Sequence, residues 1–294
     1  MEDIPGREFS PDSGLIWMVR PSIDVRIASL SPTASDILGH VGAIDDLVGV
    51  SSYCLPFIGE RKRVIGSYTT VSLKALREMD PDIVFLEGVV QDRLKDVVEG
   101  AGFRTVLLPF PRSLGTILDD VILVGTLAGR HRESVELAVR LREGMRPSEI
   151  DGGERPRVYV EFWLGRGEED RVVPGALTYV DEMIYVAGGI NVLSDVPWGF
   201  SRLDPGEVVR MDPDVVIFHL DPFLKMDRGI VERRGWAGIR AVRSGRVHTI
   251  WESSEVNLAH HGPSTLIKSI SWLSSVIGEA RRRAPGRTPH RPPE

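Results

Sequence analysis

Short apolar runs alternate with amphipathic stretches along most of the chain, and this alternation predicts strands that are each followed by a helix. The first half has predicted strands at 25–30, 47–50, 83–86 and 105–108 and helices at about 31–41, 73–79 and 91–101. The second half repeats the order, with strands at 157–161, 215–219 and 247–251 and helices at 179–187 and 263–277. This order is typical of an α/β fold with mostly parallel sheets.

One short segment occurs twice with almost the same sequence. Residues 79–84 (MDPDIV) return 132 positions later (211 − 79 = 132) as residues 211–216 (MDPDVV). Each copy is expected to end a helix at its proline, to hold a turn through its aspartates and to begin a buried strand. A common turn used twice by chance is the alternative. We interpret the repeat as a sign of two related lobes.

A continuous helical pattern separates the two series of strands. It runs from residue 113 to about 145 and is interrupted near Gly129. The first 23 residues lack periodicity, and the tail is rich in Arg and Pro, so neither is expected to join the fold. The predicted organisation is an N-terminal extension (1–23), an N-terminal lobe (24–112), a lobe-closing and linker helix (113–154), a C-terminal lobe (155–279) and a disordered tail (280–294).

Composition and charge narrow the classes of function. The 36 basic and 42 acidic residues give a net charge of −6 without a long block of like charge, so nucleic acid is not expected as a partner. No run of about 18 uncharged apolar residues occurs, so no membrane span is expected. The apolar run at 15–19 is too short for a signal-peptide core. We therefore expect a cytoplasmic monomer, or an extracytoplasmic protein if the true start lies upstream.

Motifs for catalysis or metal binding do not stand out in the sequence. There is no phosphate-binding Gly-rich loop, nucleophile elbow or zinc-protease motif. The single cysteine, Cys54, has no nearby His or cationic residue in sequence, so a structural role is expected. His219 and His248 fall in or beside strands, and His260 and His261 are adjacent, which disfavours a shared metal ion. We predict that the protein is not an enzyme and that it has neither a catalytic cofactor nor a metal site.

Aromatic residues gather in predicted loops and at strand ends. A flat, largely apolar ring system would stack on such side chains with few charges required. The alternative is that several of them close the core beneath the loops. The set consists of Tyr53, Tyr68, Phe162, Trp163, Trp198, Phe200 and Trp251.

Five segments resemble one family, the cobalamin and iron-siderophore receptors of ABC importers. They are 26–38 (RIASLSPTASDIL), 48–56 (VGVSSYCLP), 79–85, 187–198 (AGGINVLSDVPW) and 241–250 (AVRSGRVHTI), in the family's order from about 24 to 279. The Tyr-Cys-x-Pro and Pro-Trp segments point to the corrinoid-binding branch. The resemblance implies two Rossmann-like lobes joined by a single long helix, with a cobalamin-like corrinoid held in the cleft between them.

The resemblance also implies which residues touch the ligand. Cobalt itself need not be ligated by the protein. The implied contacts are Ser31, Pro32 and Thr33 at the mouth of the first lobe, Tyr53 and Tyr68 over one ligand face, Trp198 on the second lobe, and His260 as a polar contact to the corrin amides.

The sequence departs from the family where an ABC permease would dock. The family usually presents one glutamate on each lobe, seven residues before the Pro-Asp turn, and Lys74 and Gly206 occupy these positions. Glu78 and Glu207 are close enough to substitute if the helices are registered differently. Together with the missing signal peptide, this favours a cytosolic relative that binds a corrinoid, and a secreted receptor with a mis-assigned start is the rival hypothesis.

Three other functions stay open at this point. An iron-siderophore or haem receptor would need cationic side chains in the cleft, such as Arg166, Arg202 and Arg228. A scaffold or protein-binding module related to the two-lobed metallocluster proteins would need more cysteine ligands than Cys54. An enzyme that acts on a corrinoid side chain is disfavoured, because no acid, base or nucleophile stands out.

Overall fold

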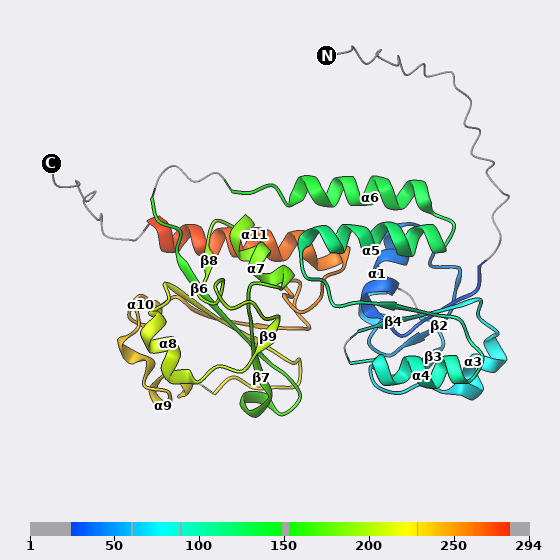
Figure 1. Ribbon diagram of the computed structural model, residues 1–294, viewed down its shortest axis with the longest axis horizontal. Coiled ribbons are helices and arrows are strands. Elements are labelled where there is room, and N and C mark those ends of the chain that lie inside the picture. Colours follow the sequence, from blue (N-terminus) through cyan, green and yellow to red (C-terminus); the bar gives the residue numbers. More distant parts are fainter. Residues whose placement is uncertain (1–24, 60, 89, 149–152, 228, 283–294) are drawn as a thin grey trace, which may run out of the picture.

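The protein folds into two α/β lobes joined along one side by a layer of helices (Figure 1). The computed structural model describes residues 25–59, 61–88, 90–148, 153–227 and 229–282. The predicted extension 1–23, residues 283–294 of the predicted tail and Arg228 lie outside the described residues. The expected α/β fold with two lobes is confirmed.

The N-terminal lobe contains a fully parallel sheet with the strand order β3-β2-β1-β4-β5. The central strands β1 and β4 are entirely buried, which explains their continuous apolar sequence. The strands are β1 (Ile27–Ser29), β2 (Leu47–Ser51), β3 (Val64–Gly66), β4 (Ile83–Glu87) and β5 (Thr105–Leu108). The helices are α1 (Pro32–His40), α2 (Leu55–Ile58), α3 (Leu73–Met79) and α4 (Asp92–Gly100). As Ser31-Pro32 indicates, Ser31 caps α1, accepting a hydrogen bond from the Ala34 N–H.

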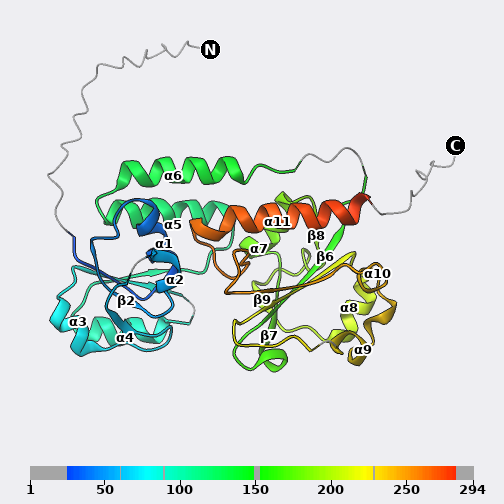
Figure 2. The same ribbon diagram turned by 180° about the vertical axis from the view of Figure 1, so that it is seen from behind.

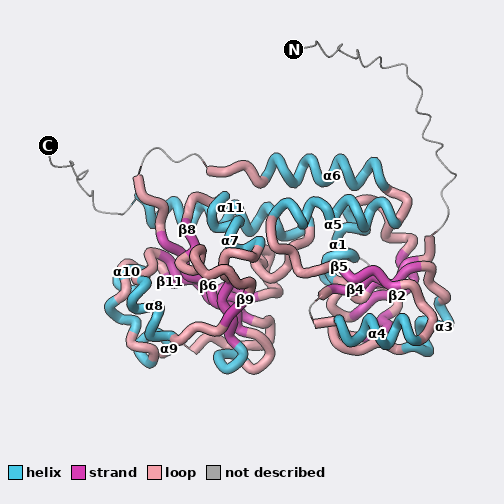
Figure 3. Tube along the Cα trace, in the orientation of Figure 1, coloured by secondary structure: helices cyan, strands magenta, loops and turns pink. Residues whose placement is uncertain are grey.

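The C-terminal lobe contains a mixed sheet with the order β11-β10-β6-β7-β9, and β8 also pairs with β6. β6, β10 and β11 are parallel, whereas β7 runs antiparallel to both of its neighbours. The strands are β6 (Arg157–Trp163), β7 (Arg171–Pro174), β8 (Ile190–Asn191), β9 (Phe200–Ser201), β10 (Val215–Leu220) and β11 (Val247–Trp251). The helices are α7 (Tyr179–Val186), α8 (Pro205–Met211), α9 (Ile230–Arg233), α10 (Arg240–Arg243) and α11 (Pro263–Arg282). Figure 3 shows one group of strands in each lobe, below the helical layer.

Two helices make up the region that was expected to connect the lobes. α5 (Leu114–Leu127) and α6 (His131–Gly144) lie side by side, and the chain turns between them at Gly129 with φ +70° (Figures 1 and 2). The chain therefore passes from one lobe to the other through α6, a helix of 14 residues, and the segment that follows it up to β6. The resemblance had implied a single long helix for this connection. Within the described residues, no helix has the length and apolarity needed to cross a membrane.

One hydrophobic core continues through the helical layer into both lobes. It includes Ile37 of α1 in the N-terminal lobe and Ile217 of β10 in the C-terminal lobe. Between them it contains Val121 of α5, Leu141 of α6 and Leu273 of α11. Because the same apolar cluster packs against both sheets, the lobes are held together by shared burial as well as by the chain connection.

The repeated turn has the same geometry in both lobes. Asp80 and Asp212 both adopt the left-handed conformation, with φ and ψ of 45° and 63° and of 42° and 63°. The hydrogen bonds around the turn repeat as well. An arginine at the start of each lobe's first strand donates its backbone N–H to the second aspartate and its Nε–H to the last helical carbonyl. The partners are Arg26, Asp82 and Met79 in one lobe and Arg157, Asp214 and Met211 in the other. This shared network supports the interpretation of two related lobes.

Candidate functional site

Large apolar side chains are exposed just beyond the carboxyl ends of several strands. Tyr53, two residues after β2, is 43% exposed, and Phe223, three residues after β10, is 84% exposed. Val90 after β4 and Leu164 after β6 are also exposed. Ligands of open α/β sheets bind beyond the carboxyl ends of the strands. The surface beyond the carboxyl ends of the strands in the two sheets is therefore the candidate binding surface.

Trp198 lies beside the edge strand β9 and is 68% exposed. Its carbonyl accepts a hydrogen bond from the Leu177 N–H at 3.4 Å, and Leu177 is also exposed. Two residues further, the ring of Phe200 lies 5.2 Å from that of Phe110, which follows β5 of the other lobe. Trp198 therefore belongs to the part of the C-terminal lobe that is close to the N-terminal lobe.

Tyr53 and Tyr68 form an aromatic pair at the same edge of the N-terminal sheet. Their ring centroids are 5.5 Å apart. Burial, followed by the nearby carboxylates of Glu87 and Glu252, raises the pKa of the Tyr68 phenol. Glu252, which contributes to this shift of the Tyr68 pKa, directly follows β11 of the C-terminal lobe.

Two acidic residues follow neighbouring strands in the C-terminal part of this surface. Asp221 follows β10 and Glu252 follows β11, and the last residues of these neighbouring parallel strands are in register. Asp221 Oδ1 accepts a hydrogen bond from the Phe223 N–H at 3.0 Å, which fixes the loop that presents the Phe223 ring. We name Tyr53, Tyr68, Trp198, Asp221, Phe223 and Glu252 the strand-end site.

The remaining aromatic residues of the predicted set have structural partners. Phe162 and Trp163 are buried in β6, and the Trp163 indole donates to Glu161 at 2.5 Å. Trp251 is half-buried and donates to the Leu224 carbonyl at 3.1 Å. For these residues, closing the core is the function that their contacts support.

Ser31 and Thr33, predicted to line the mouth of the first lobe, are buried beside Glu87. The Ser31 hydroxyl donates to Glu87 Oε2 at 3.0 Å and the Thr33 hydroxyl to Glu87 Oε1 at 2.9 Å. His261 Nε2 lies 3.3 Å from Thr33 Oγ1, and burial lowers the pKa of this imidazole to about 4. Pro32, the first residue of α1, is buried too. All these side chains already have neighbours within the protein, so a role for them in ligand contact stays a prediction.

His260 also has a protein partner. Its Nε2 lies 2.9 Å from Asp36 Oδ2, and its ring stacks on Phe57 with centroids 3.8 Å apart. Asp36 is fully buried and also accepts a hydrogen bond from the Ser264 N–H at 2.9 Å. Because Asp36 belongs to the N-terminal lobe and His260 precedes α11, this pair joins the lobes. Its predicted contact with corrin amides stays a prediction.

Two of the three cationic side chains proposed for an anionic ligand, Arg166 and Arg202, lie against a carboxylate. Arg166 makes two hydrogen bonds of 2.9 Å to the Asp170 carboxylate, and Arg202 lies 3.8 Å from the same carboxylate. Both arginines are exposed, but their charge is partly neutralised by Asp170.

The surroundings of Cys54 do not activate its thiol. Cys54 is buried, its sulfur lies 3.1 Å from the Ser51 hydroxyl, and burial raises the pKa of its thiol. No cluster of three or more His, Cys, Asp or Glu side chains in the described ranges is arranged to hold a metal ion.

The residues considered for permease docking lie on α3 and α8. Lys74 is exposed on α3, and Gly206 is exposed near the start of α8. Glu207 pairs with Arg210 of its own helix. The possible substitute Glu78 pairs with an arginine as well, at Arg63. Docking through Lys74 and Glu207 stays a prediction.

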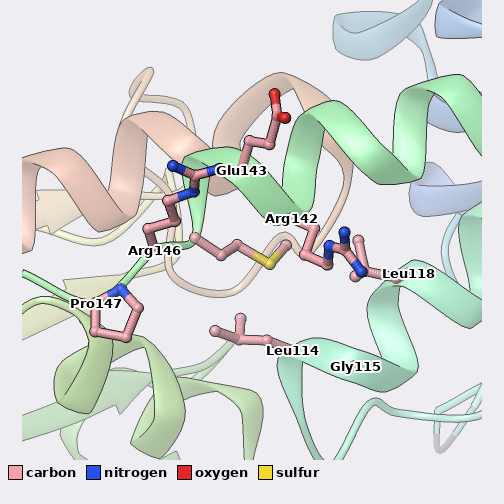
Figure 4. Close-up of a pocket in the computed structure, with 8 residues that line it drawn as sticks. Leu114, Gly115, Leu118, Arg142, Glu143, Arg146 and Pro147 are labelled. Atoms are coloured by element: carbon pink, nitrogen blue, oxygen red, sulfur yellow. The ribbon is translucent and has the colours of Figure 1, made fainter.

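A separate pocket of about 530 Å³ lies between the start of α5 and the end of α6 (Figure 4). It belongs to the helical layer and contains none of the residues that the sequence singled out. Its lining residues are Leu114, Gly115, Leu118, Arg142, Glu143, Met145, Arg146 and Pro147.

Phe223, Asp221 and Glu252 were not among the residues that the sequence analysis selected. Each lies within four residues of the end of a strand that was predicted, at 215–219 or 247–251. The rule that ligands bind beyond the carboxyl ends of strands would have pointed to them.

Comparison with known proteins identifies related sequences. The family profile described as periplasmic binding protein matches residues 27–253. A cobalamin-binding protein of Halobacterium salinarum is 26% identical over 217 residues, which cover 70% of this chain and 57% of the relative. The chain thus spans less than two thirds of that relative's length.

Solved structures with the same fold include receptors for different ligands. The apo form of the periplasmic heme-binding protein RhuT from Roseiflexus sp. RS-1 has a TM-score of 0.70 and 23% identity, over 87% of this chain and 98% of that chain. The periplasmic vitamin B12 binding protein BtuF of Vibrio cholerae has a TM-score of 0.64 and 18% identity, over 88% and 98%. At these identities the similarity concerns the fold alone.

Proposed function

Because the chain belongs to the periplasmic binding protein family, we propose that it binds a cobalamin-like corrinoid between its two lobes. The family consists of binding proteins, so the chain is a receptor and not an enzyme. The observation that carries the choice of ligand is the strand-end site, where Tyr53, Trp198 and Phe223 expose aromatic rings.

A corrinoid matches this surface in both shape and polarity. Its ring system is large and mostly apolar, and aromatic side chains gain contact area by stacking on such a surface. The amides around the ring are neutral hydrogen-bonding groups, so binding does not require cations from the protein. The relative from Halobacterium salinarum is a cobalamin-binding protein, which supports the same assignment.

A haem or siderophore receptor is the second candidate, since proteins with this fold include heme-binding receptors. Carboxylate groups on such a ligand would favour free arginines in the site. Arg166 and Arg202 are both held by Asp170, and Asp221 and Glu252 add negative charge at the strand ends. These observations favour the corrinoid.

The test is a binding measurement on the purified chain with cyanocobalamin, haem and a ferric siderophore, by gel filtration and calorimetry. We expect cyanocobalamin to co-elute and Trp198→Ala to weaken its binding by about 10-fold or more, as for an aromatic contact residue. Tyr185→Ala is the matched control, because Tyr185 is also an exposed aromatic residue but lies on α7 beneath Arg155.

The results separate the candidates. Equal loss of binding in the Trp198 and Tyr185 variants would remove Trp198 from the site. Retention of haem or siderophore without cyanocobalamin would contradict the corrinoid assignment, and retention of none of the three would favour a protein-binding module on this fold.

A further inference from the structure

The residues that directly follow most of the described strands are apolar, polar or acidic, and Arg202 after β9 is the exception. Of the strands that the structure describes, β1 to β6, β10 and β11 have neither Lys nor Arg at the first two positions after them. The first basic residues to follow are Arg166, Arg112 and Lys225, which come three, four and five residues after β6, β5 and β10. Arg166 is held by Asp170. The ends of β10 and β11 therefore carry negative charge without a basic residue at the two positions that follow each strand.

Asp221 and Glu252 supply much of this negative charge. They lie on adjacent strands, and the Glu252 N–H donates to the Leu220 carbonyl at 3.0 Å. Burial, and then the proximity of Asp221, raises the pKa of Glu252 to about 7. In the described part of the chain, no protein group donates a hydrogen bond to the Glu252 carboxyl. The group is therefore available to a ligand.

The charge of Glu252 acts on one phenol in each lobe. It raises the pKa of Tyr68 in the N-terminal lobe after the larger effects of burial and of Glu87, and the pKa of Tyr179 on α7 after those of burial, Glu87 and Tyr68. A ligand that stacks on Tyr53 and Tyr68 would have its rim close to this carboxyl. Glu252 and Asp221 would then contact the groups at the rim of the ligand.

We infer that Asp221 and Glu252 select ligands whose peripheral groups are neutral or cationic and reject those that carry carboxylates. The inference rests on the proposed corrinoid function and specifies which corrinoids bind. An intact amide of the ring can donate an N–H to the Glu252 carboxylate, a charge-assisted hydrogen bond. A carboxylate at the same place faces two like charges in a partly desolvated site, where repulsion is stronger than in water.

The experiment compares cyanocobalamin with its monocarboxylic acids, in which one corrin amide is hydrolysed, with each isomer measured separately. Calorimetry at pH 8 should give binding that is about 10-fold weaker for at least one acid isomer than for the amide. Glu252→Gln should reduce this preference to less than about 3-fold, and Asp221→Asn should reduce it in part. Glu255→Gln is the matched control, because Glu255 belongs to the same loop but is exposed and 3.7 Å from Lys268.

Each outcome decides a different point. Equal binding of the amide and every acid isomer by the unmodified protein would overturn the inference and leave the corrinoid function intact. The same holds if the preference survives in the Glu252→Gln and Asp221→Asn double variant, provided that its thermal unfolding is unchanged. If the unmodified protein binds no corrinoid at all, the proposed function fails, and the inference fails with it.

Discussion

Asp120 shows how a single side chain can oppose the stability of the fold. It lies on the apolar face of α5 with Ile117 and Val121, only 6% exposed, and its Oδ2 atom has no hydrogen-bond partner in the described residues. Burial, and then the charges of Glu87 and Asp119, raises the pKa of Asp120 to about 7. Ionisation of this carboxyl therefore disfavours the folded state.

Replacing Asp120 with Asn should stabilise the protein in a pH-dependent way. The unfolded carboxyl ionises near pH 4, and the folded one only near pH 7. The penalty is absent below pH 4, grows between pH 4 and 7, and is complete above pH 7. We expect a gain of about 2 kcal/mol at pH 8 and a smaller one at pH 5. Urea unfolding at both pH values measures this.

The exposed neighbour Asp119 provides the control for that measurement. Asp119→Asn removes the same charge one residue away without removing a buried carboxyl. It should change the free energy of unfolding by less than about 0.5 kcal/mol at either pH. A gain in Asp120→Asn that is the same at pH 5 and pH 8 would show that ionisation is not the cause.

For the candidate site residues, exposure to solvent could be predicted from sequence only where the side chain has no contact with a residue far away along the chain. Tyr53 is exposed at a strand end, in agreement with its place after a predicted strand. Ser31 and His260 were expected at the ligand but are buried against Glu87 and Asp36, which lie 56 and 224 positions away along the chain. Local patterns carry no information about such pairs, because the topology of the fold brings them together.

At the scale of elements, the strands that could be predicted are those with a buried, continuous apolar run. β5 and β11 have the predicted bounds, and β10 extends the predicted strand by one residue. β3, β7, β8 and β9 were missed because they contain only two to four residues and so show no period. This is why the antiparallel part of the second sheet could not be predicted.

The first aspartate of the repeated turn has the same backbone conformation in both lobes, but its side chain has a different role in each. The left-handed conformation of Asp80 and Asp212 costs about 1 kcal/mol for a residue with a Cβ atom and much less for Gly. Asp212 also binds Arg240 through its carboxylate at 2.8 Å. We expect Asp80→Gly to change the free energy of unfolding by less than about 0.5 kcal/mol and Asp212→Gly to lower it by about 1 kcal/mol.

Thermal unfolding of the two glycine variants, with Arg240→Ala beside them, tests this difference. Arg240→Ala should remove most of the extra cost of Asp212→Gly when the two changes are combined. Equal effects of glycine at the two turns would show that the Asp212 carboxylate adds nothing to the turn.

At the scale of the whole molecule, the lobes are fixed to each other by buried contacts at the start of α11. Asp36 of α1 accepts hydrogen bonds from the Ser264 N–H and hydroxyl and lies 2.9 Å from His260 Nε2. The same apolar cluster covers both sheets through α5, α6 and α11. We therefore expect these contacts to keep the spacing of the strand-end site nearly constant when a ligand binds.

Asp36→Asn should weaken this junction. Burial by itself would raise the pKa of Asp36, but hydrogen bonds from His260, His40 and Ser264 together hold it well below its usual range. The stabilisation is therefore present above about pH 4, where the unfolded carboxyl is ionised, and is lost as the pH falls below that value. We expect a loss of about 3 kcal/mol at pH 7 that shrinks toward zero at low pH, measured by urea unfolding.

The control Asp45→Asn, at an exposed aspartate, should leave stability unchanged at every pH. Measuring corrinoid affinity on the folded Asp36→Asn protein then separates two roles of the junction. If affinity falls together with stability, the Asp36 contacts set the distance between Tyr68 and Glu252 across the lobes. If affinity is unchanged, the shared apolar core alone holds the lobes in place, and the contacts of Asp36 contribute only to the stability of the fold.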